Sequence, residues 1–205
     1  MRTDAGHSPE FSRKVLHLTA ATTPLVYMFI SRETTLWLLV PCVVIAVLIE
    51  ILRLTSTRFG VFFRRTVGFM VRTTEWTRVT GATYVMLGAL LSIWLFPKPI
   101  AIAVLFIQVV SDTAASLVGL RYGRTRFLGK SIAGSSAFFL TAFVILALLW
   151  PETKEINLVG AAVATVAEAV PALRFGRYEL NDNLVVPLLT GIVLSLLHGS
   201  WMQGY

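Results

Sequence analysis

Asp112 is the side chain of this sequence whose position most needs a chemical reason. It lies within residues 107–120, IQVVSDTAASLVGL, a stretch apolar enough to lie inside a membrane. Burying an unpaired carboxylate costs several kcal/mol, so an ionisable residue at membrane depth indicates a functional site. The alternative is a structural acid that forms an ion pair with an arginine further along the chain.

Other chemically capable side chains share the membrane depth predicted for Asp112, although they are far apart in the sequence. They lie where predicted membrane spans begin or end on one side of the bilayer. They are Arg13, Lys14, His17, Arg121, Arg124, Lys130, Ser131, Gly134, Glu168, Asp182 and Asn183. Arg13 and His17 are four residues apart and therefore share one helix face. The sequence predicts one pocket, although Arg13 and Lys14 could instead only orient the chain, and His17 could be a packing residue.

Three carboxylates and a basic, glycine-containing loop predict the chemistry of this pocket. Asp112, Glu168 and Asp182 offer the oxygen ligands that Mg²⁺ usually shares with substrate phosphates. The cytoplasmic loop 120–131 offers cationic side chains, and its backbone amides can hold phosphates. Its Gly-Lys-Ser sequence is not a Walker loop, because Arg124 stands where that motif has its first glycine. Together these groups suit phosphoryl or nucleotidyl transfer, in which catalysis is mostly positioning and charge neutralisation.

The composition places this pocket in a membrane protein. Of the 205 residues, 56% are hydrophobic and 14% are charged, and the mean hydropathy is +0.74. A soluble domain carries about 25% charged residues. The repeated apolar runs are long enough to cross a bilayer, which takes about 20 residues each, and they suggest a lipid as the acceptor. We expect one membrane-embedded domain over residues 1–205, in which the lone Cys42 has no intrachain disulfide partner.

Hydropathy predicts an all-α, polytopic fold with about seven transmembrane helices and a cytoplasmic N-terminus. The predicted spans are 13–30, 35–52, 80–96, 99–119, 132–150, 156–172 and 183–201. Pro97 and Pro99 separate the third span from the fourth, and Pro151 ends the fifth. In this orientation 15 of the 18 Lys and Arg residues lie on the cytoplasmic side, as the positive-inside rule requires. The exceptions are Arg32, Lys98 and Lys154.

Two further segments have distinctive local patterns. In residues 57–75, arginines cover about a third of a helical wheel and phenylalanines much of the rest. This pattern predicts an amphipathic helix in the membrane interface, with a solvated basic loop as the alternative. Pro187 has no N–H, so it frees the carbonyl of Asn183 beside Asp182. A kinked, polar helix entry of this kind is tolerated where it lines a cavity.

Residues 112–139, DTAASLVGLRYGRTRFLGKSIAGSSAFF, resemble the D-x-x-A-x-x-x-G-x-x-x-G…G-K-S-x-E-G-S block of the polyprenol kinase family. That family includes dolichol kinase, phytol kinase and CTP-dependent diacylglycerol kinase, and it is related to the membrane cytidylyltransferases that make CDP-diacylglycerol. Four other segments resemble further elements of the family in the same order, so that the resemblance runs from about residue 11 to residue 190. They are RKVLHL (13–18), TGATYVMLGALL (80–91), AEAVP (167–171) and NDNLVVPL (181–188).

The resemblance implies transfer of a phosphoryl group, typically from CTP, to a membrane-embedded alcohol. By matching position, the nucleotide and metal site would contain Asp112, Lys130, Ser131, Gly134, Glu168, Asp182 and Asn183, bordered by Arg13, Lys14 and His17. Within this set we expect Asp112, Lys130 and Asp182 to be catalytic, and Asp112, Glu168 and Asp182 to bind Mg²⁺. We expect Arg121 and Arg124 to assist Lys130, Ser131, Gly134 and Asn183 in binding the nucleotide. The chain departs from the family pattern at Ser111, Ala133 and Asn181, where relatives carry Gly, Glu and Asp.

Three functions remain open at this point. The favoured one is a CTP-dependent lipid kinase, whose acceptor is a polyprenol or dolichol, a diacylglycerol or a phytol-like alcohol. The alternative is a CTP-dependent cytidylyltransferase acting on a lipid phosphate, but its D-R-x-x-D element is absent from the C-terminal region, which reads RYELNDNLVVPL. A non-enzymatic transporter or scaffold is the third, since intramembrane acids also form transport sites. We expect a multi-pass protein of a prokaryotic plasma membrane, with its active site facing the cytoplasm and no nucleic-acid partner.

Overall fold

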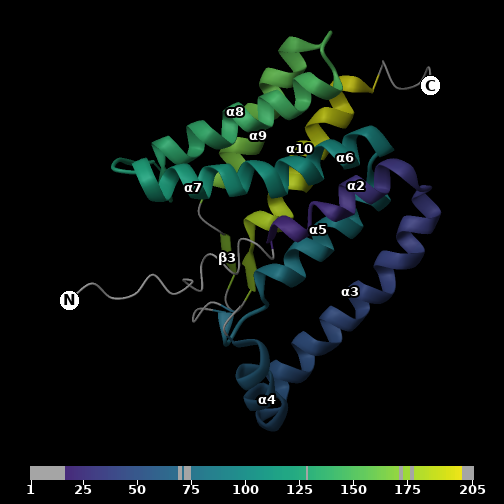
Figure 1. Ribbon diagram of the computed structural model, residues 1–205, viewed down its shortest axis with the longest axis vertical. Coiled ribbons are helices and arrows are strands. Elements are labelled where there is room, and N and C mark those ends of the chain that lie inside the picture. Colours follow the sequence, from purple (N-terminus) through teal and green to yellow (C-terminus); the bar gives the residue numbers. More distant parts are fainter. Residues whose placement is uncertain are drawn as a thin grey trace.

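The protein is almost wholly helical in its computed structural model, which describes residues 17–68, 71, 75–127, 129–170, 173–175 and 178–199 (Figure 1). The helices are α2 (Thr22–Phe29), α3 (Arg32–Thr55), α4 (Thr57–Val67), α5 (Gly81–Leu95), α6 (Lys98–Phe106), the π-helical turn η3 (Ile107–Ser111), α7 (Asp112–Tyr122), α8 (Ile132–Leu149), α9 (Lys154–Ala169) and α10 (Asp182–His198). The predicted all-α architecture is therefore confirmed, apart from two short hairpins. These pair β1 (Arg126–Phe127) with β2 (Lys130–Ser131), and β3 (Leu173–Phe175) with β4 (Tyr178–Leu180).

Three helices are long and apolar enough to cross a membrane. They are Arg32–Thr55, the continuous α6–η3–α7 helix Lys98–Tyr122, and Ile132–Leu149, while Gly81–Leu95 and Asp182–His198 are shorter apolar helices. Within the described residues, each of the seven predicted spans overlaps a helix. Helix α5 ends just before Pro97 and helix α8 just before Pro151, as predicted. Several are shorter than the ~20 residues that a bilayer crossing usually takes, so the seven-span topology stays a prediction.

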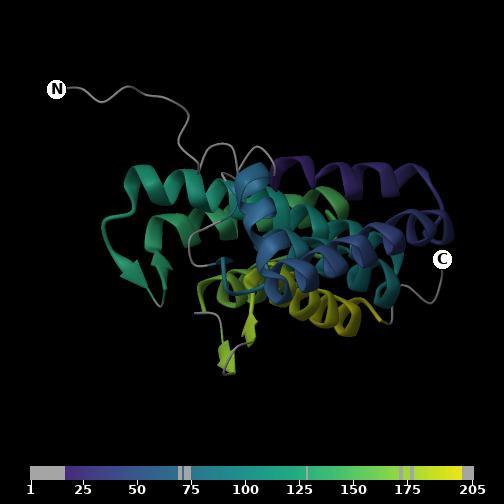
Figure 2. The same ribbon diagram turned by 90° about the horizontal axis from the view of Figure 1, so that it is seen from below.

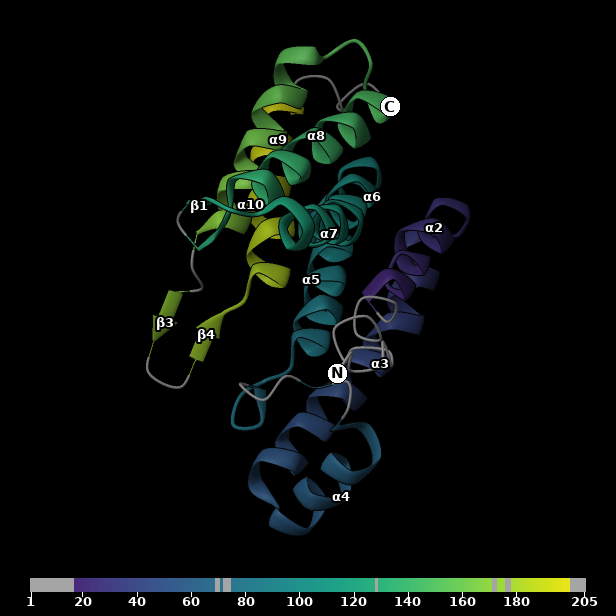
Figure 3. The ribbon, with the colours of Figure 1, turned by 60° about the vertical axis from the view of Figure 1, so that its left-hand side comes forward.

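The helices pack around a core that leaves one end of the bundle polar. Helices α8, α9 and α10 lie side by side, with α6 and α5 beside them and α2 and α3 further out (Figure 3). Small residues allow this close packing. A Cβ atom at Gly160 would lie 2.8 Å from the Leu194 side chain and 3.0 Å from that of Leu146, both of which are fully buried. Many large apolar side chains of these helices are exposed, such as Leu148 and Leu196, as expected of a protein whose surroundings are lipid.

The long helix from α6 to α7 is interrupted by one π turn. This turn, η3, ends at Ser111, directly before Asp112. Such turns are rare and occur frequently at functional sites. Behind the turn, α7 packs against α8 through small residues: a Cβ atom at Gly134 would lie 2.9 Å from the Ala115 carbonyl oxygen and 3.5 Å from the Gly119 Cα atom. The hairpin β1–β2 connects these two helices (Figure 2).

Helix α4 shows that the first part of the predicted amphipathic segment 57–75 is helical, whereas residues 69, 70 and 72–74 of that segment lie outside the described residues. It begins after Ser56, whose hydroxyl accepts the N–H of Phe59 at 3.4 Å, and it ends at Val67. Its residues lie at the far end of α3 (Figure 1). Phe62 on its outer face is 60% exposed. Its location in a membrane interface stays a prediction.

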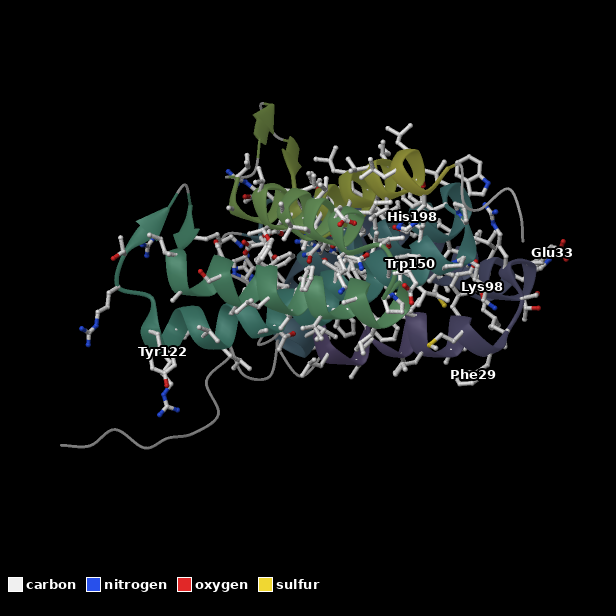
Figure 4. All side chains as sticks on the ribbon, turned by 90° about the horizontal axis from the view of Figure 1, so that it is seen from above. Phe29, Glu33, Lys98, Tyr122, Trp150 and His198 are labelled. Carbon is white, nitrogen blue, oxygen red and sulfur yellow. The ribbon has the colours of Figure 1, made fainter. Side chains whose placement is uncertain are left out.

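The two ends of the helices differ in the way that the predicted orientation requires. Phe29, Glu33 and Lys98 lie together at one end of the molecule, and Tyr122 lies at the opposite end (Figure 4). Lys98 is one of the three basic residues predicted to lie outside, and its Nζ atom donates to the Ile30 carbonyl oxygen at 2.9 Å. The arrangement of the described helices is thus compatible with the predicted sidedness, which remains a prediction.

Candidate active site

A cavity of about 830 Å³ lies at the Asp112 end of the spans. Its volume is near the upper end of the range for ligand sites, about 300–1,000 Å³. Eight of the residues selected from the sequence line it: His17, Asp112, Lys130, Ser131, Gly134, Glu168, Asp182 and Asn183. The predicted convergence of these distant segments on one pocket is therefore present in the structure.

Lys130 lies at the centre of the polar end of this cavity. Strand β2 carries it, and its Nζ atom lies 2.8 Å from Glu168 Oε1 and 3.2 Å from Asp182 Oδ2. Burial alone would lower the pKa of the Lys130 ammonium, but the Asp182, Glu168 and Asp112 carboxylates outweigh burial and raise it above its usual value. Lys130 is therefore a fixed positive charge at any physiological pH.

Glu168 presents one carboxylate oxygen that the described residues leave unpartnered. Its side chain is buried near the end of α9, and Oε2 has no hydrogen-bond partner among the described atoms. Glu168 also lines a second cavity of only about 10 Å³, together with Asp112, Asp182 and Gln108. Such a space accommodates one small ligand atom, since a single water needs roughly 10–15 Å³.

The predicted Mg²⁺ site can be compared with this geometry. Within the described residues no three His, Cys, Asp or Glu side chains form a group able to hold a metal ion. The physical reason is that Lys130 lies between Glu168 and Asp182, while Asp112 is next to His17. Mg²⁺ commonly takes only one or two carboxylates plus phosphates and waters, so its binding by Asp182 and by Glu168, whose Oε2 atom has no described partner, stays a prediction. A site with all three carboxylates stays a prediction.

Asp112 faces the cavity beside His17. The Asp112 Oδ2 atom lies 3.5 Å from His17 Nε2, and the Asp112 side chain is 37% exposed whereas that of His17 is 16% exposed. The same Nε2 atom also lies 3.4 Å from the backbone oxygen of Gln108. His17 therefore contacts the acid, and the carboxylate remains accessible to a ligand.

The start of α10 carries the second half of the polar cluster. The Asn181 side chain caps the helix by accepting the N–H of Asn183 at 2.9 Å. Asn181, which stands where relatives carry Asp, therefore has a local structural role. The carbonyl of Asn183, which Pro187 frees, accepts a hydrogen bond from Gln108 Nε2 at 2.5 Å. The sequence identified the free carbonyl but not its partner, because Gln108 gave no signal beyond being a polar residue in an apolar run.

Ser131 and the glycines around it shape the N-terminus of α8. The Ser131 hydroxyl accepts the N–H of Gly134 at 3.0 Å and so caps the helix. No side chain fits at Gly123, because a Cβ atom there would lie 2.2 Å from the Gly119 oxygen and 2.7 Å from Ser131. These close contacts bring a helix N-terminus to the cavity, and helix N-termini attract phosphate groups.

Two of the predicted nucleotide-binding residues are not brought to the cavity. Arg121, in the last turn of α7, and Arg124, just after that helix, are both exposed, and the Arg121 guanidinium lies 5.6 Å from the ring centre of Tyr122. This geometry gives no support to their predicted role, because neither side chain is among those that line the cavity. Arg126, in β1, lines the cavity instead. Arg13 and Lys14 lie outside the described residues.

A buried ion pair that the sequence analysis missed fixes another wall of the cavity. Glu50 and Arg53 in α3 are both buried and lie 2.5 Å apart. Glu50 Oε1 accepts from the N–H and hydroxyl of Thr80 at 3.0 Å and 2.5 Å. Arg53 donates to the backbone oxygens of Glu75, at 3.1 Å, and Arg78. In the sequence, the available signal for this ion pair was two opposite charges three residues apart in an apolar run.

Fold and site together define a helical membrane protein that encloses, at one end of its spans, a cavity lined by a lysine–carboxylate cluster. An uncharacterised protein of Rickettsia prowazekii is 31% identical over 188 residues, covering 87% of this chain and 90% of its own. CTP-dependent diacylglycerol kinase 1 of Saccharomyces cerevisiae is 27% identical, covering 91% and 72%. A probable chloroplastic phytol kinase of Triticum aestivum is 29% identical, covering 58% and 45%.

The chain belongs to the polyprenol kinase family of lipid kinases. This confirms the resemblance first seen in residues 112–139 and in the four other matching segments. No protein-family profile matches the chain, and no solved structure matches it.

Proposed function

We propose that this protein transfers the γ-phosphoryl group of a nucleoside triphosphate, with CTP favoured, to the hydroxyl of a membrane lipid alcohol. The observation that carries the proposal is that Lys130, paired with Glu168 and Asp182, faces the same cavity as Asp112. The relatives named as kinases support it, and the yeast relative named CTP-dependent favours CTP as the donor. Diacylglycerol is the first acceptor to test, because that relative matches most of the chain.

The donor's phosphates would bind at the polar end of the cavity. The permanently charged Lys130 attracts them, and the capped N-terminus of α8 at Gly134 adds the positive end of a helix dipole. Glu168 and Asp182 would hold Mg²⁺, which neutralises phosphate charge when it is bound. Positioning and charge neutralisation of this kind account for most catalysis of phosphoryl transfer.

The acceptor would lie against the apolar wall of the same cavity. That wall is formed by side chains from α3, α4 and α5, among them Leu39, Phe63, Val67 and Met86. Asp112 would orient the acceptor hydroxyl and take its proton as the oxygen bonds to the γ-phosphorus. The bond from the γ-phosphorus to the bridging β-oxygen breaks, and the nucleoside diphosphate leaves. His17, 3.5 Å from Asp112, holds the carboxylate in place.

A transfer assay with CTP labelled separately at the α and γ phosphates tests this function directly. Purified protein in lipid–detergent micelles, with Mg²⁺ and a panel of lipid alcohols and lipid phosphates, should move only the γ label into lipid. Movement of the α label would instead establish a cytidylyltransferase. Movement of neither label, with ATP tested as well, would contradict both enzymatic functions.

The Asp112→Asn variant tests the catalytic assignment in the same assay. The substitution keeps the shape of the side chain but removes its charge, and loss of a positioned base costs about 10²–10⁴-fold in rate. We expect turnover to fall within that range while membrane insertion and thermal stability persist. Ser92→Ala is the matched control, since Ser92 is a fully buried polar residue of α5 and is not among the residues lining the cavity. Near-normal turnover of Asp112→Asn would show that the acid is structural.

A further inference from the structure

Gln108 is a buried polar residue that the proposed mechanism does not use. It lies in the π turn η3, and its side chain is 2% exposed. Its Nε2 atom donates to the Asn183 carbonyl oxygen at 2.5 Å, although the two residues are 75 positions apart. In an unbroken helix that carbonyl would accept the N–H of residue 187, but Pro187 has none. Gln108 therefore supplies from another helix the donor that α10 lacks.

Helix α5 leaves room for this bond. A Cβ atom at Gly88 would lie 2.6 Å from the Asn183 carbonyl oxygen and 3.4 Å from Gln108 Nε2. No real side chain fits at the first of these distances without a backbone shift. Three elements thus meet at one point, which we call the Gln108–Asn183 joint: η3 supplies the donor, α10 the acceptor, and α5 the space.

The joint connects the two halves of the catalytic cluster. On one side, Asp112 follows Gln108 by four residues, and the backbone oxygen of Gln108 lies 3.4 Å from the Nε2 atom of His17, which contacts Asp112. On the other side, Asn183 directly follows Asp182, which contacts Lys130 at 3.2 Å. Among the described residues, this is the side-chain hydrogen bond that ties the π turn to the start of α10.

From this juxtaposition we infer that Gln108 is a positioning residue, which sets the separation between Asp112 and the Lys130–Asp182 pair by bonding to the carbonyl that Pro187 leaves free. It acts through backbone and through other side chains rather than on the reacting atoms. The π turn contributes to this arrangement, because it determines from which face of the α6–η3–α7 helix Gln108 and Asp112 project. The role in turnover rests on the proposed kinase function, whereas the bond itself does not.

The test exploits the fact that Pro187→Ala returns the missing N–H to α10. Gln108→Leu removes the donor and should lower kcat by about 100-fold, the loss expected of a misplacement near 1 Å, with little change in the KM for nucleotide. Adding Pro187→Ala to Gln108→Leu should restore at least about 10-fold of that loss, because residues sharing one partner couple strongly. Thr190→Val is the matched control, since Thr190 is a fully buried residue of α10 whose hydroxyl has no described partner.

Thermal unfolding of the wild type, Gln108→Leu, Pro187→Ala and the double variant separates this inference from the kinase function. Gln108→Leu should lower the Tm, and Pro187→Ala should recover it, whether or not the protein transfers phosphate. If the wild type moves no label but the Tm values show this rescue, the kinase function fails and the joint stands. Equal effects of Pro187→Ala in the presence and absence of Gln108 would overturn the joint. Should Gln108→Leu fail to fold, Gly88→Ala disrupts the same carbonyl, and retention of full kcat by that variant would also overturn the inference.

Discussion

At the scale of single residues, the site is organised around one lysine. Lys130 contacts two carboxylates, and one of them, Glu168, is 3% exposed. Removing one charge of a buried ion pair destabilises a protein more than replacing both charges with apolar residues, because an uncompensated charge remains. Lys130 therefore has a structural as well as a chemical role, and an experiment must separate the two.

Lys130→Met should abolish transfer and also lower the Tm, because Glu168 then lacks its cation. The double variant Lys130→Met with Glu168→Gln removes both charges, so we expect it to regain stability without regaining turnover. Lys154→Met, at an exposed lysine that begins α9, is the control and should change neither quantity. If the double variant recovered turnover, Lys130 would be a purely structural cation.

The pH dependence has a defined sign at this residue. The folded-state pKa of Lys130 is raised above the model-compound value of 10.5. Where its carboxylate partners are ionised, the stabilisation that depends on Lys130 protonation is therefore complete below that value, and it is lost only as the pH rises through the higher folded-state pKa. Turnover should accordingly show no loss from Lys130 deprotonation between about pH 7 and 9.

At the scale of elements, the cavity wall depends on a polar network inside an apolar helix. Glu50 and Arg53 of α3 bind the backbone of the segment from Glu75 to Thr80, and both ends of that segment line the cavity. The Arg53 guanidinium also lies 5.6 Å from the ring centre of Phe63, which lines the cavity from α4. One ion pair thus holds two neighbouring parts of the wall.

Glu50→Gln should destabilise the protein by about 3–5 kcal/mol, since it leaves Arg53 buried without a counter-charge. Glu50→Leu combined with Arg53→Leu should be less destabilising in denaturant or thermal unfolding. The double variant should nevertheless raise the KM for the lipid acceptor, because the segment before α5 is no longer held. An unchanged KM in a folded double variant would contradict this role of the ion pair.

Parts of these elements were predictable from the sequence. Pro97 and Pro151 mark helix ends correctly, because proline lacks the N–H that a helix interior needs. The proximity of Asp112, Lys130 and Asp182 could be predicted, because each lies at or near the end of a predicted span on the same side of the membrane. That argument needs only hydropathy and the alternation of direction between successive spans.

Other parts depend on three-dimensional packing and could not be predicted. The π turn at Ile107–Ser111 has no signature in a single sequence, and without it the pairing of Gln108 with Asn183 cannot be anticipated. Arg121 was assigned to the nucleotide because it is basic and close to Lys130 in the sequence, yet its exposed side chain is not among those that line the cavity, although Leu120 and Gly123 are. The Glu50–Arg53 pair was missed because span boundaries and counts of basic residues carry no information about side-chain partners.

At the scale of the whole molecule, sidedness is the property on which the proposed function depends. A cytoplasmic nucleotide can reach the cavity only if the Asp112 end faces inward. The three basic residues predicted outside, Arg32, Lys98 and Lys154, begin α3, α6 and α9. Helix α4 adds a cationic outer face, with Arg58 and Arg65 exposed, that suits an anionic cytoplasmic leaflet.

Single cysteines test this topology in intact cells. In a Cys42→Ser background, Lys154→Cys should react with a membrane-impermeant maleimide added outside, whereas Arg124→Cys should react only after the cells are permeabilised. Both positions are exposed, so accessibility alone does not distinguish them. The reverse labelling pattern would place the cavity on the outer face and exclude a cytoplasmic nucleotide as its donor.

The side chains lining the cavity also impose an ionic constraint on what can enter it. Glu75, Asp112, Glu168 and Asp182 face only two basic side chains of the described lining, Arg126 and Lys130. A bare triphosphate would add to this negative excess, and in a low-dielectric setting such repulsion is strong. We therefore expect the proposed nucleotide to enter the cavity together with a cation that offsets its charge.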